Sequence, residues 1–196
     1  MKILAINGSY RRGGIMDQAV EAAAAAARAG GAEVETVLLT EKRVEFCTNC
    51  RACTQAPGGE RGACPIADDM SGILDAAEAA GGLILAAPVN CFNVSAVYRR
   101  FMERGTPYAY WPWGAAAPAF RIKAGGKKAV LITSSAMPSF FGRLFTGALR
   151  ALKLTATTLG AKVAGTLFIG LSSLEEKPRL AARDRRLAEA LGRKLL

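Results

Sequence analysis

The sequence contains no histidine among its 196 residues. Histidine is the commonest general base at neutral pH and a frequent metal ligand. Its absence therefore excludes Ser-His and Cys-His nucleophile pairs and every histidine-bearing metal site. If the chain is an enzyme, we expect a bound cofactor to carry the difficult chemistry.

Long apolar runs are also missing. The longest, residues 83–89, has the length of a buried strand and is far short of the roughly 20 residues that span a bilayer. The first eight residues hold one charge and too short an apolar run for a secretory signal. With 51% hydrophobic residues and the length of one ordinary domain, the chain is expected to be a soluble, cytoplasmic protein.

Acidic residues are scarce in the second half of the chain. Residues 1–104 carry 11 Lys and Arg against 12 Asp and Glu, whereas residues 105–196 carry 15 against 4. An excess of positive charge is typical of proteins that bind an anionic partner, such as a phosphorylated ligand, a nucleic acid or an acidic membrane surface. It is equally typical of a basic surface that only contacts solvent. No DNA- or RNA-binding motif accompanies the charge, so we expect no nucleic-acid partner.

Short apolar runs alternate with alanine-rich or amphipathic stretches along the chain. Five runs have the length and composition of buried strands: residues 2–7, 32–39, 83–87, 129–133 and 163–169. Helices are predicted at residues 15–29, 68–80, 94–104, 140–159 and 174–195. This alternation predicts an α/β fold, a parallel sheet with helices on both faces, as a single domain over residues 1–196.

Two segments interrupt the alternation. Residues 46–66 hold four of the five cysteines, and residues 105–126 mix tyrosines, tryptophans and a phenylalanine with prolines and glycines. We expect both to be long loops. The aromatic loop would form a lid over a bound ring, an oligomer contact or a satellite of the core.

The turn after the first strand, Gly8 to Gly14, is rich in glycine and leads into a helix. In a doubly wound sheet this turn lies at the carboxyl end of the strand, where ligands bind, and the N–H groups of a helix N-terminus suit a phosphate. Ser9 adds a hydroxyl, and Arg11 or Arg12 adds a positive charge. There is neither a dinucleotide fingerprint nor a P-loop motif. The turn is therefore either a phosphate site or an ordinary βα turn with two surface arginines.

The loop from Pro88 to Ala96 directly follows the third strand. It combines backbone donors, two asparagines, a serine and an aromatic residue, a mixture that suits a flat heteroaromatic ring with polar edges. The alternative is a plain helix start that is capped by Asn93 or Ser95.

Four cysteines are spaced C-x2-C-x2-C-x10-C, at Cys47, Cys50, Cys53 and Cys64. Four thiolates without histidine suit an iron-sulfur cluster or an all-cysteine zinc site. The alternative is a set of free or redox-active thiols, since a structural disulfide is not expected in a reducing compartment. Cys91 lies apart from them, in the loop after the third strand.

Together these motifs resemble the NADPH-dependent FMN reductase branch of the flavodoxin-like superfamily, close to the iron-sulfur flavoproteins. The resemblance rests on residues 2–9 with Arg11 and residues 13–14, the cysteine motif with residues 64–70, residues 87–96 and 101–104, and residues 159–166. It implies a three-layer sandwich whose five-stranded parallel sheet has the order 2-1-3-4-5. FMN would lie across the carboxyl ends of strands one, three and four.

The resemblance assigns FMN contacts to three loops. The phosphate would be held by Ser9, Arg11, Gly13, Gly14, Ile15 and Met16. The isoalloxazine ring and ribityl chain would be contacted by Pro88, Val89, Asn90, Cys91, Phe92, Asn93, Val94 and Ser95. Ser134, Ser135 and Ala136 would face the pyrimidine edge. Relatives usually have Asn-Thr at positions 15–16, so one phosphate-binding hydroxyl is missing here.

The resemblance implies an FMN-dependent NAD(P)H oxidoreductase that reduces a quinone, a flavin or a similar small acceptor. The chemistry would be centred on the flavin, with Asn90, Cys91 and Phe92 near the ring. Arg121, Lys123 or Arg143 would attract the extra phosphate of NADPH.

Two alternatives stay open. One is an iron-sulfur flavoprotein that transfers electrons through a [4Fe-4S] cluster on Cys47, Cys50, Cys53 and Cys64. The more distant one is a zinc-binding, non-enzymatic module with an anionic partner. Because relatives commonly associate, we expect a homodimer or a homotetramer.

Overall fold

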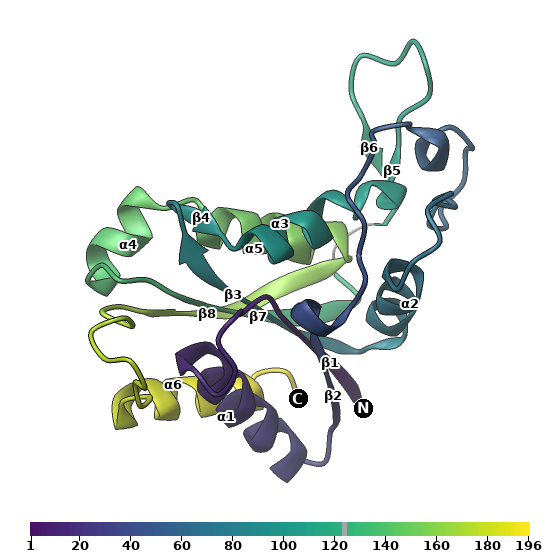
Figure 1. Cartoon of the computed structure of the whole chain (residues 1–196). Helices are drawn as coiled ribbons and strands as arrows, with labels where there is room; N and C mark the ends of the chain where they lie inside the picture. Colours follow the sequence, from purple (N-terminus) through teal and green to yellow (C-terminus); the bar gives the residue numbers. More distant parts are fainter. Residues whose placement is uncertain (123–124) are drawn as a thin grey trace.

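The computed structural model describes residues 1–122 and 125–196, so Lys123 lies outside the described residues. Five parallel strands form the central sheet in the order β2-β1-β3-β7-β8 (Figure 1). They are β1 (Lys2–Asn7), β2 (Glu33–Leu38), β3 (Gly82–Asn90), β7 (Lys127–Ser134) and β8 (Ala161–Ile169). Because β7 and β8 are the fourth and fifth of the predicted strands, the predicted order 2-1-3-4-5 is confirmed.

Helices cover both faces of this sheet and so form the outer layers of the predicted sandwich. One face carries α1 (Ile15–Ala29) and α6 (Ala182–Arg193); the other carries α2 (Met70–Ala79), α3 (Ala96–Glu103) and α5 (Ala148–Thr158) (Figure 1). In β3, Leu83 and Leu85 belong to the core beneath α2, α3 and α5, whereas Ile84 and Ala86 belong to the core beneath α1 and α6. A central parallel strand is buried on both faces, which explains its almost continuous apolar sequence.

The helix predicted at residues 140–159 is in fact two helices, α4 (Ser139–Phe145) and α5. Thr146, between them, has an extended backbone, and the N–H of Gly147 donates to the carbonyl of Phe92 at 2.8 Å. The chain thus breaks where it contacts the loop after β3. Local helix propensity carries no information about such a contact.

The basic helix predicted at residues 174–195 begins only at Ala182, as α6. The chain before it crosses the start of α1, where the Gln18 side chain donates to the carbonyl of Pro178 at 2.9 Å. The same side chain accepts the N–H of Leu180 at 2.8 Å. Pro178 disfavours helix in the residue before it, so this stretch is free to make these contacts instead.

Two antiparallel hairpins lie outside the parallel order. β4 (Asn93–Val94) pairs with the end of β3, and β5 (Ala109–Tyr110) pairs with β6 (Ala119–Phe120) in the aromatic segment that was predicted as a loop. The β5/β6 hairpin projects from the sheet beside the cysteine segment, residues 46–66 (Figure 1). Three short 3-10 turns complete the structure: η1 (Leu39–Glu41), η2 (Ala52–Thr54) and η3 (Thr106–Tyr108).

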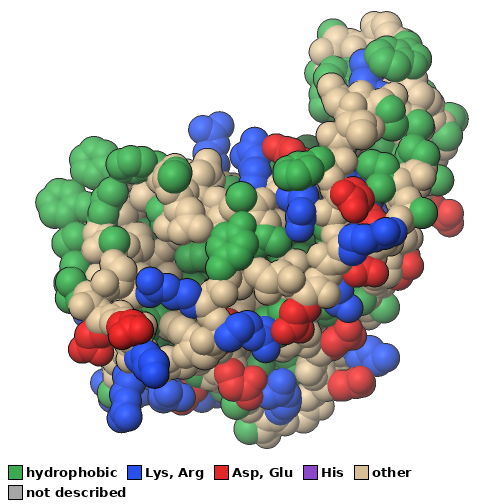
Figure 2. All heavy atoms as spheres, in the orientation of Figure 1, with side chains coloured by type: hydrophobic (Ala, Val, Ile, Leu, Met, Phe, Trp, Pro, Cys, Tyr) green, Lys and Arg blue, Asp and Glu red, His purple; other side chains and the backbone are tan. Residues whose placement is uncertain are grey.

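Hydrophobic side chains gather on the surface of the projecting hairpin and over α4 (Figure 2). On α4 the exposed ones are Phe140, Phe141, Leu144 and Phe145. Within the described ranges, no helix has the length and apolar character that crossing a membrane requires.

Candidate functional site

A cavity of about 400 Å³ opens where the loops after β1, β3 and β7 meet, at the carboxyl edge of the sheet. The predicted cofactor residues that line it are Ser9, Arg11, Ile15, Met16, Pro88, Val89, Asn90, Ser134, Ser135 and Ala136. The structure thus brings residues from all three predicted loops to one place. The other predicted residues are outside the lining: Gly13, Gly14, Cys91, Phe92, Asn93, Val94 and Ser95.

The first loop folds around the start of α1. The N–H of Arg11 donates to the Ser9 hydroxyl at 3.2 Å, and the N–H of Gly13 donates to the Asp17 carboxylate at 2.7 Å. Gly14, the N-cap of α1, supplies no side-chain cap. The N–H groups of Ile15 and Met16, in the first turn, therefore have no partner within the helix and present a positive dipole end to the cavity.

Arg11 adds a full positive charge at this end of the cavity. It makes no ion pair among the described residues, whereas its neighbour Arg12 pairs with Glu41 at 3.2 Å. Two adjacent arginines thus differ in their surroundings, and only Arg11 belongs to the cavity lining.

The second loop is a tight hairpin rather than an open loop. Asn90 pairs with Asn93, and the two residues between them, Cys91 and Phe92, have φ angles of 47° and 61°. Positive φ at both central positions is the geometry of a two-residue type I′ turn, which glycine and asparagine favour. Cys91 and Phe92 therefore form an exposed tip, and only the strand side of the turn reaches the cavity.

Ser95 is buried behind the cavity and joins the first two loops. Ser95 is the N-cap residue of α3, as the plainer interpretation of this loop expected, but its hydroxyl donates to the carbonyl of Gly8 at 2.6 Å and makes no capping hydrogen bond to the helix. The N–H of Val97 donates to the hydroxyl of Tyr10 at 3.0 Å. Two hydrogen bonds thus fix the start of α3 against the first loop.

Four residues that the sequence did not single out complete the lining: Tyr10, Ser172, Ser173 and Pro178. Ser172 donates to the carbonyl of Ser135 through its N–H and through its hydroxyl, each at 3.0 Å. Tyr10 lies in the first loop, whereas Ser172, Ser173 and Pro178 follow β8, whose carboxyl end lies at the same edge of the sheet. A place just after a predicted strand was the signal that could have identified them, but Pro178 fell within the helix predicted at residues 174–195.

The four clustered cysteines differ in their exposure. Cys53 is buried, Cys47 and Cys64 are half-buried, and Cys50 is exposed. Burial raises the pKa of the Cys53 thiol, and the charges of Cys64, Cys47 and Cys50 raise it further. The backbone N–H of Ala52 and the Thr48 hydroxyl lower the pKa of Cys50. The other three thiols therefore lie near enough to Cys53 to affect its titration.

A metal site is not formed by these side chains as they stand. Within residues 1–122 and 125–196, no three Cys, Asp or Glu side chains lie close enough together to hold a metal ion. The donor set has the chemistry of a cluster or zinc site, but the arrangement of the thiols does not have its geometry.

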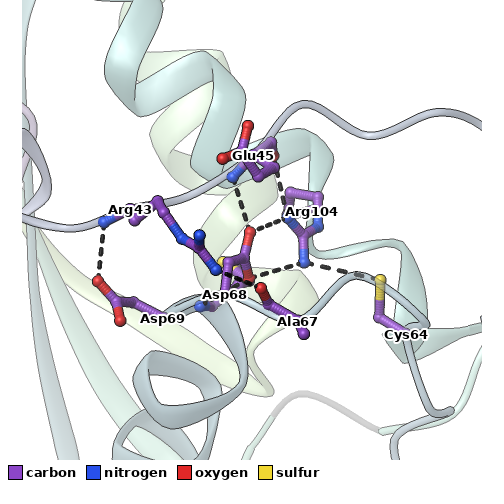
Figure 3. Close-up of polar contacts among 8 residues, drawn as sticks. Arg43, Glu45, Cys64, Ala67, Asp68, Asp69 and Arg104 are labelled. Atoms are coloured by element: carbon purple, nitrogen blue, oxygen red, sulfur yellow. Dashed lines mark hydrogen bonds and ion pairs between the residues drawn. The ribbon is translucent and has the colours of Figure 1, made fainter.

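A buried ion pair closes the base of the cysteine segment (Figure 3). Arg104 contacts Asp68 at 2.5 Å, and both side chains are almost completely buried. Arg104 also donates to the carbonyl of Glu45 at 2.9 Å and to the Cys64 sulfur at 3.6 Å. These contacts join Glu45, which precedes the cysteine segment, to Cys64 near its end and to Asp68, which follows it.

Asp68 is held in its charged form by this arrangement. Burial alone would raise the pKa of its carboxyl, but the Arg104 guanidinium and the backbone N–H groups of Glu45 and Met70 outweigh it and lower the pKa. Sequence reasoning gave Asp68 and Arg104 no role. Both were part of the family resemblance, which was the only signal available.

The aromatic hairpin contacts the cysteine segment, and none of its described residues lines the cavity, so the structure does not favour a lid, which was one of three alternatives for this segment. The guanidinium of Arg51 lies between the rings of Trp111 and Trp113, 4.0 and 4.2 Å from their centroids. The N–H of Trp111 donates to the carbonyl of Thr54 at 2.9 Å.

The structure describes two of the three cationic residues that were predicted to attract the NADPH phosphate. Arg121 donates to the carbonyls of Cys53, Ala56 and Gly58 and so belongs to the cysteine segment, which corrects the prediction. Arg143 is exposed on α4, 5.8 Å from the Phe168 ring centroid. Lys123 lies outside the described residues.

Solved structures with a similar fold include an azoreductase from Bacillus anthracis, with a TM-score of 0.73 and 13% identity over 99% of each chain. A flavone reductase has a TM-score of 0.66 and 22% identity over all of this chain and 62% of its own. At these identities the likeness shows the fold alone.

Among curated proteins, an iron-sulfur flavoprotein of Archaeoglobus fulgidus is 34% identical over 112 residues, which are 57% of this chain and 49% of that protein. One from Methanosarcina thermophila is 36% identical over 104 residues, 53% of this chain and 52% of that protein. The chain thus spans about half the length of the curated relatives it matches. The model of the NADPH-dependent FMN reductase family matches residues 1–172. The chain belongs to the NADPH-dependent FMN reductase family.

Proposed function

We propose that this protein binds FMN in the 400 Å³ cavity and transfers reducing equivalents from NAD(P)H to a small acceptor such as a quinone or a flavin. The family is one of flavin-dependent oxidoreductases. The observation that carries the proposal is the convergence of three loops at one cavity beside the uncapped N-terminus of α1. Its volume lies within the usual range for small-molecule sites.

The lining fits the chemistry of FMN. Arg11 and the free N–H groups of Ile15 and Met16 suit a phosphate, and these backbone groups replace the hydroxyl that positions 15–16 lack. Asn90, Ser134 and Ser135 offer polar contacts for the edges of a flat ring. One end of the cavity is therefore cationic, and the other has hydrogen-bonding groups without charge.

Bound FMN would accept a hydride and pass electrons on to the acceptor. The protein's own part is to bind and orient. Ser95 and Tyr10 keep the first two loops in register through their hydrogen bonds to Gly8 and Val97. No side-chain acid or base is assigned, which agrees with the absence of histidine.

An iron-sulfur flavoprotein remains the second candidate function. It is favoured by the four cysteines spaced C-x2-C-x2-C-x10-C in one segment and by the names of the curated relatives. A zinc-binding, non-enzymatic module does not fit a family of flavin-dependent oxidoreductases.

Association into a homodimer or homotetramer belongs to the same proposal. Exposed Phe140, Phe141, Leu144 and Phe145 give α4 an apolar surface next to the loop that carries Ser134 to Ala136, and such surfaces commonly mark contacts between subunits. Sedimentation equilibrium of the purified chain tests it: a monomer at micromolar concentration contradicts it.

Steady-state oxidation of NADH and NADPH, with a quinone as acceptor, tests the proposed activity. We expect turnover that rises with the fraction of protein loaded with FMN and vanishes in FMN-free protein. Iron and acid-labile sulfide are assayed on the same anaerobically purified sample. About four iron atoms per chain would favour the second candidate, and FMN-loaded protein without turnover would contradict the first.

A further inference from the structure

A second cavity, of about 360 Å³, lies next to the first. Its lining comes from the first loop, η1, the start of the cysteine segment and α3: Tyr10, Thr40, Phe46, Ala96, Val97 and Arg100. Tyr10 lines both cavities, so they are neighbours with this side chain between them. No role has been given to this second cavity, which we name the Arg100 cavity.

Two aromatic rings form the walls of the Arg100 cavity. Tyr10 is 52% exposed and Phe46 is 68% exposed, unusually open for large aromatic side chains. The hydroxyl of Tyr10 accepts the N–H of Val97 at 3.0 Å, which fixes this ring against α3. Two exposed aromatic rings in the lining of one cavity suit the binding of a flat ring.

Among the described residues that line this cavity, Arg100 alone is charged. Its guanidinium lies 5.5 Å from the centroid of the Phe46 ring, and its buried Nε has no hydrogen-bond partner among the described residues. Within the same part of the chain it makes no ion pair, whereas its neighbour Arg99 pairs with Glu103 at 3.0 Å. A buried guanidinium N–H without an acceptor is unfavourable, and an anionic group would relieve it.

We propose that the Arg100 cavity binds a planar ring that bears an anionic group, belonging to the molecule that exchanges electrons with the flavin. The inference rests on the proposed function, because it places this ligand one side chain away from the FMN cavity. Two sources share the chemistry. One is the adenosine end of NADPH with its 2′-phosphate, and the other is an aromatic acceptor that carries a carboxylate or sulfonate.

The test is calorimetric titration of FMN-loaded protein with 2′,5′-ADP and, separately, with anthraquinone-2-sulfonate. FMN fills the first cavity, so these probes report on the second. We expect Arg100→Gln to weaken binding about tenfold or more, since a hydrogen bond to a charged group is lost. Phe46→Ala should weaken it by several-fold. Arg99→Gln is the matched control, because Arg99 lies on the same helix but is absent from the lining.

The two probes distinguish the sources. Loss of 2′,5′-ADP binding alone in Arg100→Gln supports the NADPH end, and loss of sulfonate binding alone supports the acceptor. Equal binding of both probes by Arg100→Gln and the unaltered protein would overturn the inference, as would an equal loss in Arg99→Gln.

Failure of the proposed function has a different signature. If the protein binds no FMN, the proposed function has failed, and the same two probes are then titrated into the FMN-free protein. Weaker binding by Arg100→Gln would still locate the ligand in this cavity, while identical binding by all variants would overturn the inference.

Discussion

Ser95 donates its hydroxyl hydrogen to the carbonyl of Gly8 at 2.6 Å, and this bond joins the loop after β3 to the loop after β1. Both residues are buried. A side chain on Gly8 would collide with Tyr98, since a β-carbon there would lie 2.7 Å from the Tyr98 Cβ. This hydrogen bond and this close approach, together with the bond from Val97 to Tyr10, therefore set the spacing of two loops that border the 400 Å³ cavity.

Replacing Ser95 with alanine tests this relationship. The Ser95→Ala protein leaves the buried Gly8 carbonyl without this donor, so the free energy of unfolding should fall by about 1–3 kcal/mol. Urea denaturation measures it, with Ser139→Ala, at an exposed position, as the control. An unchanged free energy of unfolding would show that the bond does not hold the loops together.

The strained tip of the β3/β4 hairpin predicts a stabilising substitution. Phe92 has a φ angle of 61° and a side chain that is 61% exposed, so Phe92→Gly relieves strain and loses little packing. We expect about 1 kcal/mol of added stability, or roughly 2–4 °C in Tm. Thermal unfolding measures the change. A lower Tm would mean that the Phe92 ring packs against a partner, such as a second copy of the chain.

Asp68 predicts a specific loss of stability in acid. Its pKa is lower in the folded protein than the value near 3.9 of an unfolded chain. Its contribution is therefore complete above that value and is lost as the pH falls through the folded pKa, below about pH 4. Urea unfolding between pH 3 and 7 should show a weaker pH dependence in Asp68→Asn than in the unaltered protein.

At pH 7 the same variant should be less stable by about 3 kcal/mol, because the buried charge of Arg104 loses its counter-ion. Asp75→Asn serves as the comparison, since that carboxylate is 62% exposed and its pair with Arg61 lies at the surface. If the two variants lose similar amounts of stability, the Arg104 pair does not secure the cysteine segment.

The close contact between Gly62 and Cys53 predicts that a larger residue at position 62 opens the cysteine segment. A β-carbon at Gly62 would overlap the backbone carbonyl of Cys53, whereas one at Gly59 would meet nothing nearby. Gly62→Ala should therefore push the stretch around Gly62 away from that around Cys53 and expose the buried Cys53 thiol. Iodoacetamide labelling, followed by mass spectrometry, should show about tenfold faster modification of Cys53 or more. Gly59→Ala should label at the original rate, and equal rates in both variants would contradict the account.

The central sheet could be predicted because its signals are local. The apolar run at residues 83–87 and the glycines around it mark a buried strand whatever the surroundings. Ten residues that line the 400 Å³ cavity were among those that the family resemblance implied as cofactor contacts, and loops at the carboxyl ends of parallel strands converge at one edge of a sheet. Family resemblance supplied the strand order, which a single sequence does not encode in any short pattern.

The missed features all depend on contacts between distant segments. The break between α4 and α5 follows from the bond between Gly147 and Phe92, 55 positions apart. The support that Trp111 and Trp113 give to Arg51 joins two segments that each look like an irregular loop. The pairing of Asp68 with Arg104 leaves no periodic trace in the sequence, because Asp68 lies just before one helix and Arg104 just after another, 36 positions away.

Fluorescence titration of the FMN-free protein with FMN tests the central claim most directly. We predict saturable quenching at micromolar concentration, and Arg11→Ala should weaken binding at least about threefold, or ~0.7 kcal/mol. Arg12→Ala should bind FMN as the unaltered protein does, because Arg12 pairs with Glu41 at the surface. An absence of saturable quenching, or equal affinities in all three proteins, would contradict the proposed FMN site at the start of α1.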